Sequence, residues 1–525
     1  MSDQTSDCIL AAPARHARLP LDAGATVALA QNADAAATPL ASAQTHDELW
    51  EEVGSLTVIV PLPNDPERVR QLQETLARID HDIRHLRSAL ASVPRLHVAR
   101  WVVLPERVRG CGARTQPSLV MWTVHDGPRD AHLQDLVREA PGILDAIYAP
   151  CGVGYPAGGT PAEVVRFLAA HAAHGRVASF VGTAGISVDT VLLQTQLVRE
   201  LVTHIRALRE KQPGLSNEHI FLNACEFIRT GIADPTLRAF AARRPRTPRL
   251  RNLYVDLIGT VLRSRITLSV LAVVVATAIG LGMWWRIPGE PGAVLAFGSL
   301  YLAGLIGLAV LLIIGFGFAL RFAEKREARQ WIPASNRELD EHHAMLRERD
   351  NEGAGMNRVT IVTDLKPGLV RQVTLRFVLW LIAFRAGRNF AGTLEGVETI
   401  HFAQWRIVDG GRRLLFMSNY DGQALDYFRE FGENLAPGVN AIWGNTEGMP
   451  PTTAVVGNGS RNLEDFENAA RVHQIPTDAW YCGYPNRRYT TAAINDNWRI
   501  HRLLHASPTP PRVEEWMALL ARYGA

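Results

Sequence analysis

Short apolar runs alternate with longer amphipathic stretches in two separate parts of the chain, in the same order both times. In the first part, the apolar runs lie at residues 56–61, 96–104 and 118–124, with helix-like stretches at 65–91 and 129–139. In the second part, they lie at 359–362, 399–408 and 413–418, with helix-like stretches at 367–390 and 424–435. Continuous or alternating β-branched runs predict strands, and a period near 3.6 predicts helices. The chain therefore contains an internal repeat.

Each repeat continues with a short apolar segment that we interpret as a strand, at residues 145–148 and 439–443. The resulting order, β-α-β-β-α-β, is the ferredoxin-like plan. Each copy then adds a helix, a strand and a helix, at 161–174, 177–181 and 188–203 in the first repeat and at 462–473, 478–482 and 491–504 in the second. The predicted fold class is α+β, with two tandem ferredoxin-like repeats that join as an intrachain pseudo-dimer.

Two apolar stretches without charged residues separate the repeats, at 266–285 and 293–320. About twenty helical residues cover the ~30 Å hydrocarbon core of a bilayer. The segment between them, residues 286–292, is rich in Pro and Gly, so we predict a transmembrane hairpin inserted between the repeats. Basic residues flank the two stretches: Arg243, Arg244, Arg246, Arg249, Arg251, Arg263 and Arg265 before them, and Arg321, Lys325, Arg326 and Arg329 after them. By the positive-inside rule, both repeats and both termini face the cytoplasm.

The predicted organisation has six parts. They are a disordered tail (1–48), the first repeat (49–205), a basic helical linker (206–265), the hairpin (266–320), a charged helical linker (321–356) and the second repeat (357–525). A further apolar stretch at 374–384 is too short to span a bilayer. It is either the first core helix of the second repeat or a helix that lies on the bilayer with its arginines reaching the interface. The sequence leaves both readings open.

Composition narrows the classes of function. The net charge is +3 and the basic residues gather beside the apolar stretches, which favours anionic lipid over nucleic acid as their partner. The five cysteines are scattered without a Cys-x-x-Cys pair, so neither a structural zinc site nor a disulfide framework is expected. We predict no metal site.

Histidine and aspartate recur at matching places in the two repeats. His97 and His401 occupy the second strand, and Asp126 and Asp421 end the third. A histidine there could act as a general base or as a metal or haem ligand, and a carboxylate could accept a proton or orient the histidine. The alternatives are a histidine hydrogen-bonded at the edge of the core and an aspartate that caps the helix following it.

The second repeat has the richer set of polar side chains. Asn419 and Asn445 correspond to Val124 and Pro150 of the first repeat. We therefore predict that any ligand site lies in the second repeat and that the first repeat is its structural partner. The candidate catalytic residues are His401, Asp421, Asn419 and Asn445, and the equivalents in the first repeat are His97 and Asp126.

Several strings in the second repeat resemble an uncharacterised family of large bacterial membrane proteins. They are His401-Phe-Ala-Gln-Trp405, Ser418-Asn-Tyr-Asp-Gly422, Asn445-Thr-Glu-Gly-Met-Pro450 and Tyr481-Cys-Gly-Tyr-Pro485. More distantly, the fold resembles the dimeric α+β barrel superfamily, which includes dye-decolourising peroxidases and chlorite dismutases. Those peroxidases carry Gly-x-x-Asp-Gly above haem, whereas Ser418 and Thr123 replace the leading glycine here. The resemblance implies that haem is the cofactor to test for. Apart from this resemblance, the cofactor is unknown.

These observations predict a general function but no specific reaction. We expect a multi-pass protein of the bacterial inner membrane that binds or transforms a hydrophobic, lipid-derived molecule in the second repeat. The alternatives are a non-catalytic membrane scaffold and a haem-dependent peroxidase-like enzyme. The expected partners are the lipid bilayer and a hydrophobic small molecule, and no nucleic acid.

Overall fold

The computed structural model describes residues 48–49, 52–108, 114–173, 178–245, 291–335, 338–340, 355–386, 396–484 and 489–524. These residues form two compact units. The sheet unit contains the described residues of 50–192 and 246–495, and the helical unit contains those of 1–49, 193–245 and 496–525.

Two four-stranded antiparallel sheets form the centre of the sheet unit. The first sheet has the order β14-β3-β6-β2, from Ala479–Cys482, Leu96–Leu104, Ser118–Asp126 and Val53–Pro61. The second has the order β7-β10-β11-β9, from Ala178–Val181, Ile400–Val408, Arg413–Asp421 and Met356–Asp364. The α+β class and the repeated order of strands are confirmed.

The two repeats exchange their edge strands. β14 belongs to the second repeat but pairs with β3 of the first, with Ala479 opposite Trp101. In the matching place, β7 of the first repeat pairs with β10 of the second, with Ala178 opposite Trp405. Each sheet is therefore completed by the other half of the chain.

The expected fourth strands at 145–148 and 439–443 are wrong, because both segments are helical. They belong to α4 (Pro141–Tyr148) and α15 (Ala436–Trp443). Each helix has a proline in its first turn, where the missing N–H costs nothing. The buried side chains of α4 are spaced i, i+3 and i+4, at Leu144, Ile147 and Tyr148. The β-α-β-β-α-β plan therefore does not describe either repeat taken alone.

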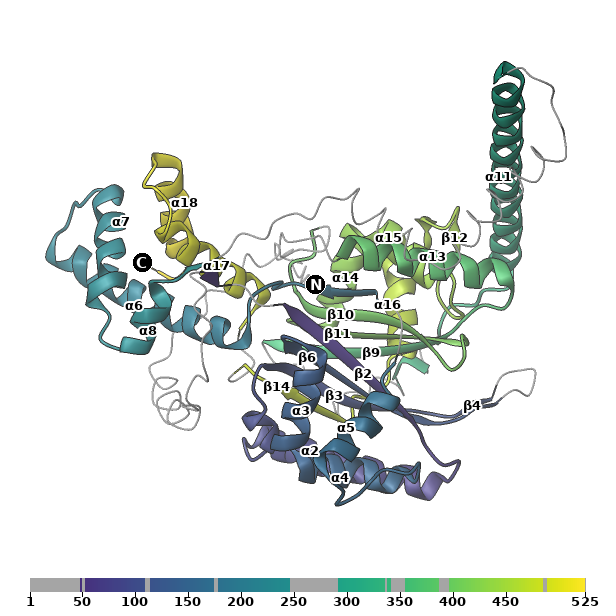
Figure 1. The fold of residues 1–525 in the computed structure, drawn as a ribbon, viewed down its shortest axis with the longest axis horizontal. Helices are drawn as coiled ribbons and strands as arrows, with labels where there is room; N and C mark the ends of the chain where they lie inside the picture. Colours follow the sequence, from purple (N-terminus) through teal and green to yellow (C-terminus); the bar gives the residue numbers. More distant parts are fainter. Residues whose placement is uncertain are drawn as a thin grey trace, which may run out of the picture. The chain divides into compact units, whose positions relative to one another are not determined.

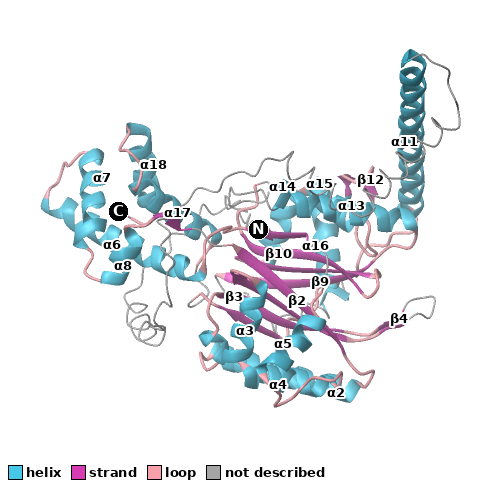
Figure 2. Cartoon of the chain, in the orientation of Figure 1, coloured by secondary structure: helices cyan, strands magenta, loops and turns pink. Residues whose placement is uncertain are grey.

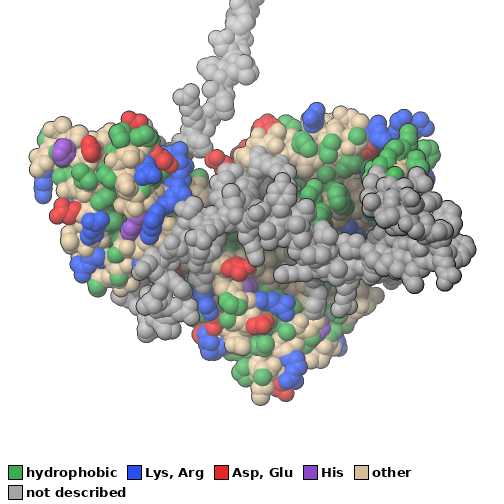
Figure 3. Space-filling model, turned by 45° about the horizontal axis from the view of Figure 1, so that its top comes forward, with side chains coloured by type: hydrophobic (Ala, Val, Ile, Leu, Met, Phe, Trp, Pro, Cys, Tyr) green, Lys and Arg blue, Asp and Glu red, His purple; other side chains and the backbone are tan. Residues whose placement is uncertain are grey.

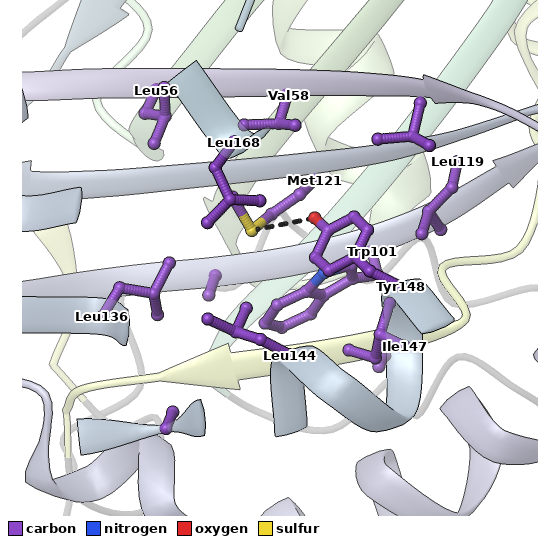
Figure 4. Close-up of a cluster of buried hydrophobic side chains, with 14 of the residues drawn as sticks. Leu56, Val58, Trp101, Leu119, Met121, Leu136, Leu144, Ile147, Tyr148 and Leu168 are labelled. Carbon is purple, nitrogen blue, oxygen red and sulfur yellow. Dashed lines mark hydrogen bonds between the residues drawn. The ribbon is translucent and has the colours of Figure 1, made fainter. Parts of the chain in front are cut away.

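Helices cover the outer face of each sheet, so the sheets lie between two helical layers (Figures 1 and 2). The first layer consists of α2 (Pro66–Arg84), α3 (Arg129–Glu139), α4 and α5 (Pro161–Ala170). The second consists of α13 (Leu369–Ala386), α14 (Ala424–Asn434), α15 and α16 (Leu463–Val472). Each layer shares an apolar core with its sheet. In the first core Trp101, Met121 and Tyr148 pack together, and the Tyr148 hydroxyl donates to the Met121 sulfur at 3.4 Å (Figure 4).

The inner faces of the two sheets meet through buried polar contacts. Arg100 donates to the carbonyl oxygens of Val359 (2.9 Å) and Ser418 (2.7 Å) on the opposite sheet. Thr57 and Gln404 also hydrogen-bond across the interface, at 3.1–3.2 Å. Buried polar groups are costly unless paired, so these contacts fix the alignment of one sheet on the other.

The described chain contains one helix that is long and apolar enough to cross a membrane. It is α11 (Pro291–Ala328), with the candidate span at Ala303–Ala328. The expected hairpin is therefore not shown. Its first helix, at residues 266–285, lies outside the described residues.

The helical unit is formed around the C-terminal part of α6 (Val188–Lys211) and of α17 (Thr491–Leu504). Its other elements are α7 (Asn217–Glu226), a π-helical turn (Phe227–Gly231), α8 (Pro235–Ala241), α18 (Pro510–Ala521) and the parallel pair β1 (Glu48–Leu49) and β8 (Arg244–Pro245). The remaining short elements, all in the sheet unit, are Ala89–Ser92, β4 (Arg107–Val108), β5 (Arg114–Thr115), Ala149–Cys151, β12 (Thr452–Thr453), β13 (Gly457–Asn458) and Gly459–Arg461.

Candidate functional site

Both candidate histidines lie in β-bulges. The pairing of β3 with β6 shifts register between Leu96 and Val98, at His97. The pairing of β10 with β11 shifts at the matching point, at His401. A bulge inserts one extra residue and redirects its side chain. Both imidazoles are completely buried.

Each histidine is hydrogen-bonded to the aspartate at the end of the neighbouring strand. Nε2 of His97 lies 2.7 Å from Oδ1 of Asp126, and Nε2 of His401 lies 2.7 Å from Oδ1 of Asp421. We call these pairs the first and the second dyad. The structure therefore brings together the histidine and carboxylate predicted for each repeat.

The second oxygen of each carboxylate caps a helix that is distant in sequence. Asp126 accepts from the backbone N–H of Val188 at 2.9 Å, at the start of α6. Asp421 accepts from the N–H of Thr491 at 2.8 Å, at the start of α17. An anion is favourable at a helix N-terminus, where backbone N–H groups lack partners. The expected capping of the following helices is wrong, since α3 and α14 have no side-chain cap.

In the first dyad, Tyr484 completes a chain of hydrogen bonds. Its hydroxyl lies 2.6 Å from Nδ1 of His97. Burial, together with the nearby Cys482, Asp126 and Asp421, raises the pKa of Tyr484 well above its usual value. The phenol therefore stays protonated and is able to donate to Nδ1. When it does, Nε2 of His97 carries the hydrogen that is donated to Asp126.

Among the residues that the structure describes, the second dyad has no such partner. The N–H of Gly483 donates to the carbonyl of His97, and that of Gly182 donates to the carbonyl of His401, both at 2.8 Å. Gly182 and Gly483 are therefore equivalent positions. The residue after each glycine is Thr183 in one case and Tyr484 in the other, so Thr183 corresponds to Tyr484. Among the described residues, Nδ1 of His401 and the hydroxyls of Thr183 and Thr491 are buried without hydrogen-bond partners. The carboxylate of Asp421 is 11% exposed, whereas that of Asp126 is fully buried.

The two asparagines of the predicted site are engaged elsewhere. The amide oxygen of Asn419 accepts from Arg100 at 2.6 Å, within the interface between the sheets. The amide of Asn445 donates to the carbonyl of Ala441 at 2.8 Å and accepts from Arg371 at 3.4 Å. The predicted set of four residues is thus reduced to His401 and Asp421.

A stacked aromatic pair adjoins each dyad, and the two pairs differ in chemistry. In the first repeat His125 stacks on His132, with ring centroids 4.0 Å apart. In the second, Tyr420 stacks on Tyr427 at 4.1 Å. Burial lowers the pKa of His125 to about 4 and that of His132 to about 2, so both are neutral at pH 7. Burial raises the pKa of Tyr427, which is therefore also neutral.

Sequence reasoning missed three residues of this region, Arg100, Tyr484 and Thr183. Arg100 could have been found from the sequence, because a charged residue in the middle of an apolar strand must find buried acceptors. Tyr484 lies within one of the quoted strings, but its contact with His97 depends on the strand exchange. Thr183 gave no signal.

Neither of two cavities among the described residues is lined by His97 or His401, although the smaller one reaches Phe402, next to His401. One of about 350 Å³ is lined by Ile59, Pro61, Thr115, Gln116, Pro117, Ser118, Asp409 and Arg412. Another, of about 30 Å³, lies between the strand edges near Gly54 and Phe402 and has room for little more than a water molecule. Neither is lined by a His, Cys or Met that could bind haem iron. The described residues around the dyads do not fit a haem group.

No family model, curated protein or solved structure matches this chain.

Proposed function

We propose that this protein is a non-catalytic scaffold held at a membrane, in which the paired sheets of the two repeats serve for the docking of a partner. One observation carries the proposal: both histidines are buried, and the aspartate of each dyad holds the N-terminus of a helix. His97 and His401 are completely buried, and the second carboxylate oxygen of each aspartate accepts a hydrogen bond from the N-terminus of a helix. Groups used in this way position secondary structure.

Attachment to the membrane is supported by α11. Its apolar side chains are exposed to a degree that is unusual for a soluble protein, for example Leu311, Ile313 and Phe318. We further propose the two-helix hairpin, with both repeats on the cytoplasmic side of a bacterial inner membrane, because the basic residues flank both apolar stretches. Face-to-face sheets with exchanged strands also suit the proposed kinship with dimeric α+β barrels built on ferredoxin-like halves.

The scaffold proposal is tested on the full chain purified in mild detergent. We expect no Soret band and no stoichiometric small molecule or lipid by mass spectrometry of the extracted protein. His401→Gln and His97→Gln should lower thermal stability to a similar extent without changing what the protein carries. A stoichiometric ligand that is lost on one substitution alone would contradict the scaffold.

A second candidate function is favoured by the unpaired groups at the second dyad. Among the described residues, Nδ1 of His401 has no hydrogen-bond partner, while Asp421 holds the ring through Nε2 and is 11% exposed. This arrangement supports an acid–base site in the second repeat, with His401 as the base. The same preparation decides the matter. If bound lipid is lost in His401→Gln and in Asp421→Asn but retained in His97→Gln, the acid–base site replaces the scaffold.

A further inference from the structure

α13 carries apolar side chains on two opposite sides. Leu375 and Leu379 point into the core of the second repeat. On the other side Leu369, Val373, Phe377 and Leu381 are each 40–76% exposed. Residues four apart lie on the same side of a helix, so these four form one continuous row, the α13 stripe. An exposed apolar row of this length marks a surface that contacts something other than water.

The C-terminal end of α11 is fixed to the same domain as α13. Nε of Arg371, on α13, donates to Glu327 of α11 at 3.0 Å, and the ammonium of Lys366 lies 3.1 Å from Glu327. Glu324 of α11 accepts from the backbone N–H groups of Ala454 (2.9 Å) and Val455 (2.7 Å). These buried ionic contacts hold α13 at the foot of α11 (Figure 1). Whatever surrounds α11 therefore comes close to α13.

The apolar surface of α11 continues to its foot. Phe318 and Phe322 are each more than 70% exposed there, on either side of Leu320, the last residue of the charge-free stretch. Exposed basic residues follow at once, Lys325, Arg326 and Arg329. On the face that carries α11, hydrophobic side chains gather with lysine and arginine side chains beside them (Figure 3). Apolar side chains next to exposed positive charge suit the boundary between acyl chains and anionic headgroups.

We propose that the α13 stripe lies in the surface of the bilayer that α11 enters, with Phe377 at the level of the upper acyl chains and the basic residues after Leu320 on anionic headgroups. The inference rests on the proposed membrane attachment and adds a second, peripheral contact to it. The two readings of residues 374–384 are then both correct, because one side of α13 is a core helix face and the other lies on lipid. The contact fixes the tilt of the scaffold relative to the membrane.

The test uses a cysteine-free full-length chain in vesicles of phosphatidylcholine with a minority of phosphatidylglycerol. A nitroxide label is attached at Phe377→Cys or, as a control on α2 of the first repeat, at the exposed Gln71→Cys. Flotation of the vesicles reports the attachment of the chain. Collision of the label with oxygen, which concentrates in acyl chains, and with a water-soluble nickel chelate reports its depth.

We expect the label at 377 to collide with oxygen and to be shielded several-fold from nickel, and the label at 71 to show the reverse. Introducing Leu369→Asn, Val373→Asn and Leu381→Asn should expose the label at 377 to nickel, whereas Leu86→Asn, at an equally exposed leucine, should not. Weaker shielding in vesicles of phosphatidylcholine alone would support the role of the basic residues, and equal shielding would overturn that role.

Three outcomes separate the proposals. If the chain floats but the label at 377 meets nickel as freely as the label at 71, the α13 contact is overturned and the attachment stands. If the chain does not float, both are overturned. Shielding from oxygen and nickel alike means that protein covers the stripe, and overturns the lipid contact; dipolar broadening would identify that protein as a second copy.

Discussion

The two dyads share one backbone arrangement, which we call the frame, and differ in the side chain that lies next to Nδ1 of the histidine. Both have a bulged histidine, a carboxylate that caps a distant helix, and a glycine after the exchanged strand. Only the first has Tyr484 on Nδ1 of its histidine, whereas in the second Nδ1 of His401 and the Thr183 hydroxyl have no partner among the described residues. The backbone frame is therefore the part that the strand exchange requires, because each sheet needs its exchanged strand. The side chain next to Nδ1 of each histidine is not required by the exchange and differs between the repeats.

The largest expected effect tests the shared part of the frame. A Cβ on Gly182 would lie 2.0 Å from the carbonyl oxygen of Ile400, and one on Gly483 would lie 2.3 Å from that of Leu96. Both contacts are with backbone, which cannot move aside without breaking the exchanged pairing. Gly182→Ala and Gly483→Ala should each destabilise the fold by about 5 kcal/mol or more, measured by urea unfolding of the purified chain.

Matched controls exist in each repeat. Gly142 of α4 and Gly438 of α15 have open space around a new Cβ, and alanine there should raise stability by up to about 1 kcal/mol. If Gly182→Ala were tolerated while Gly483→Ala was not, the two exchanged strands would not be equivalent and the frame would not be shared.

The sequence predicted most strands and helices of the repeats because their periodicity is local. β3, α3 and α17 have the expected bounds. The short apolar segments ending at Tyr148 and Trp443 are helical, and the sequence held a usable signal in Pro141 and Pro437, which suit the first turn of a helix. The exchange could not be predicted, because the pairing of four-residue strands is decided by contacts with distant parts of the chain.

Of the candidate site, the sequence predicted the proximity of each histidine to its aspartate. Repeated strand ends brought each histidine close to its aspartate, as the sequence pattern suggested. Asn445 was placed with them because it follows a segment expected to be a strand of the same sheet. That segment is a helix, so Asn445 lies instead beside Arg371. An error in one element therefore moved one residue out of the site.

A smaller effect is expected from the stacked pairs beside the dyads. His125 and His132 have folded pKa values below the unfolded value of 6.5, so the unfolded state binds more protons at acidic pH. Stability is then full above pH 6.5 and falls by about 1.4 kcal/mol per pH unit for each histidine as the pH decreases, or by about 4 kcal/mol for the pair at pH 5. In the second repeat, burial raises the pKa of Tyr427, so this phenol is already protonated and takes up no proton in this range.

Hydrogen exchange at pH 7, 6 and 5, corrected for intrinsic rates, measures this difference locally. Opening of β6 should become easier as the pH falls, and replacing both histidines by phenylalanine should remove most of that dependence. An unchanged slope in the double variant would assign the acid sensitivity to other groups. The same slope in Tyr420→Phe plus Tyr427→Phe is the expected control.

The smallest effect concerns the position where the repeats diverge. Tyr484→Phe removes the hydroxyl that is hydrogen-bonded to Nδ1 of His97 and leaves that buried nitrogen without its partner, so it should cost about 1–2 kcal/mol. Thr183→Val removes a buried hydroxyl without a described partner at nearly constant volume, so stability should stay the same or rise by up to about 1 kcal/mol. Thermal unfolding in detergent measures both changes. If Thr183→Val cost as much as Tyr484→Phe, the hydroxyl would be paired through a bound water or ligand, and the second dyad would be a complete site rather than an open one.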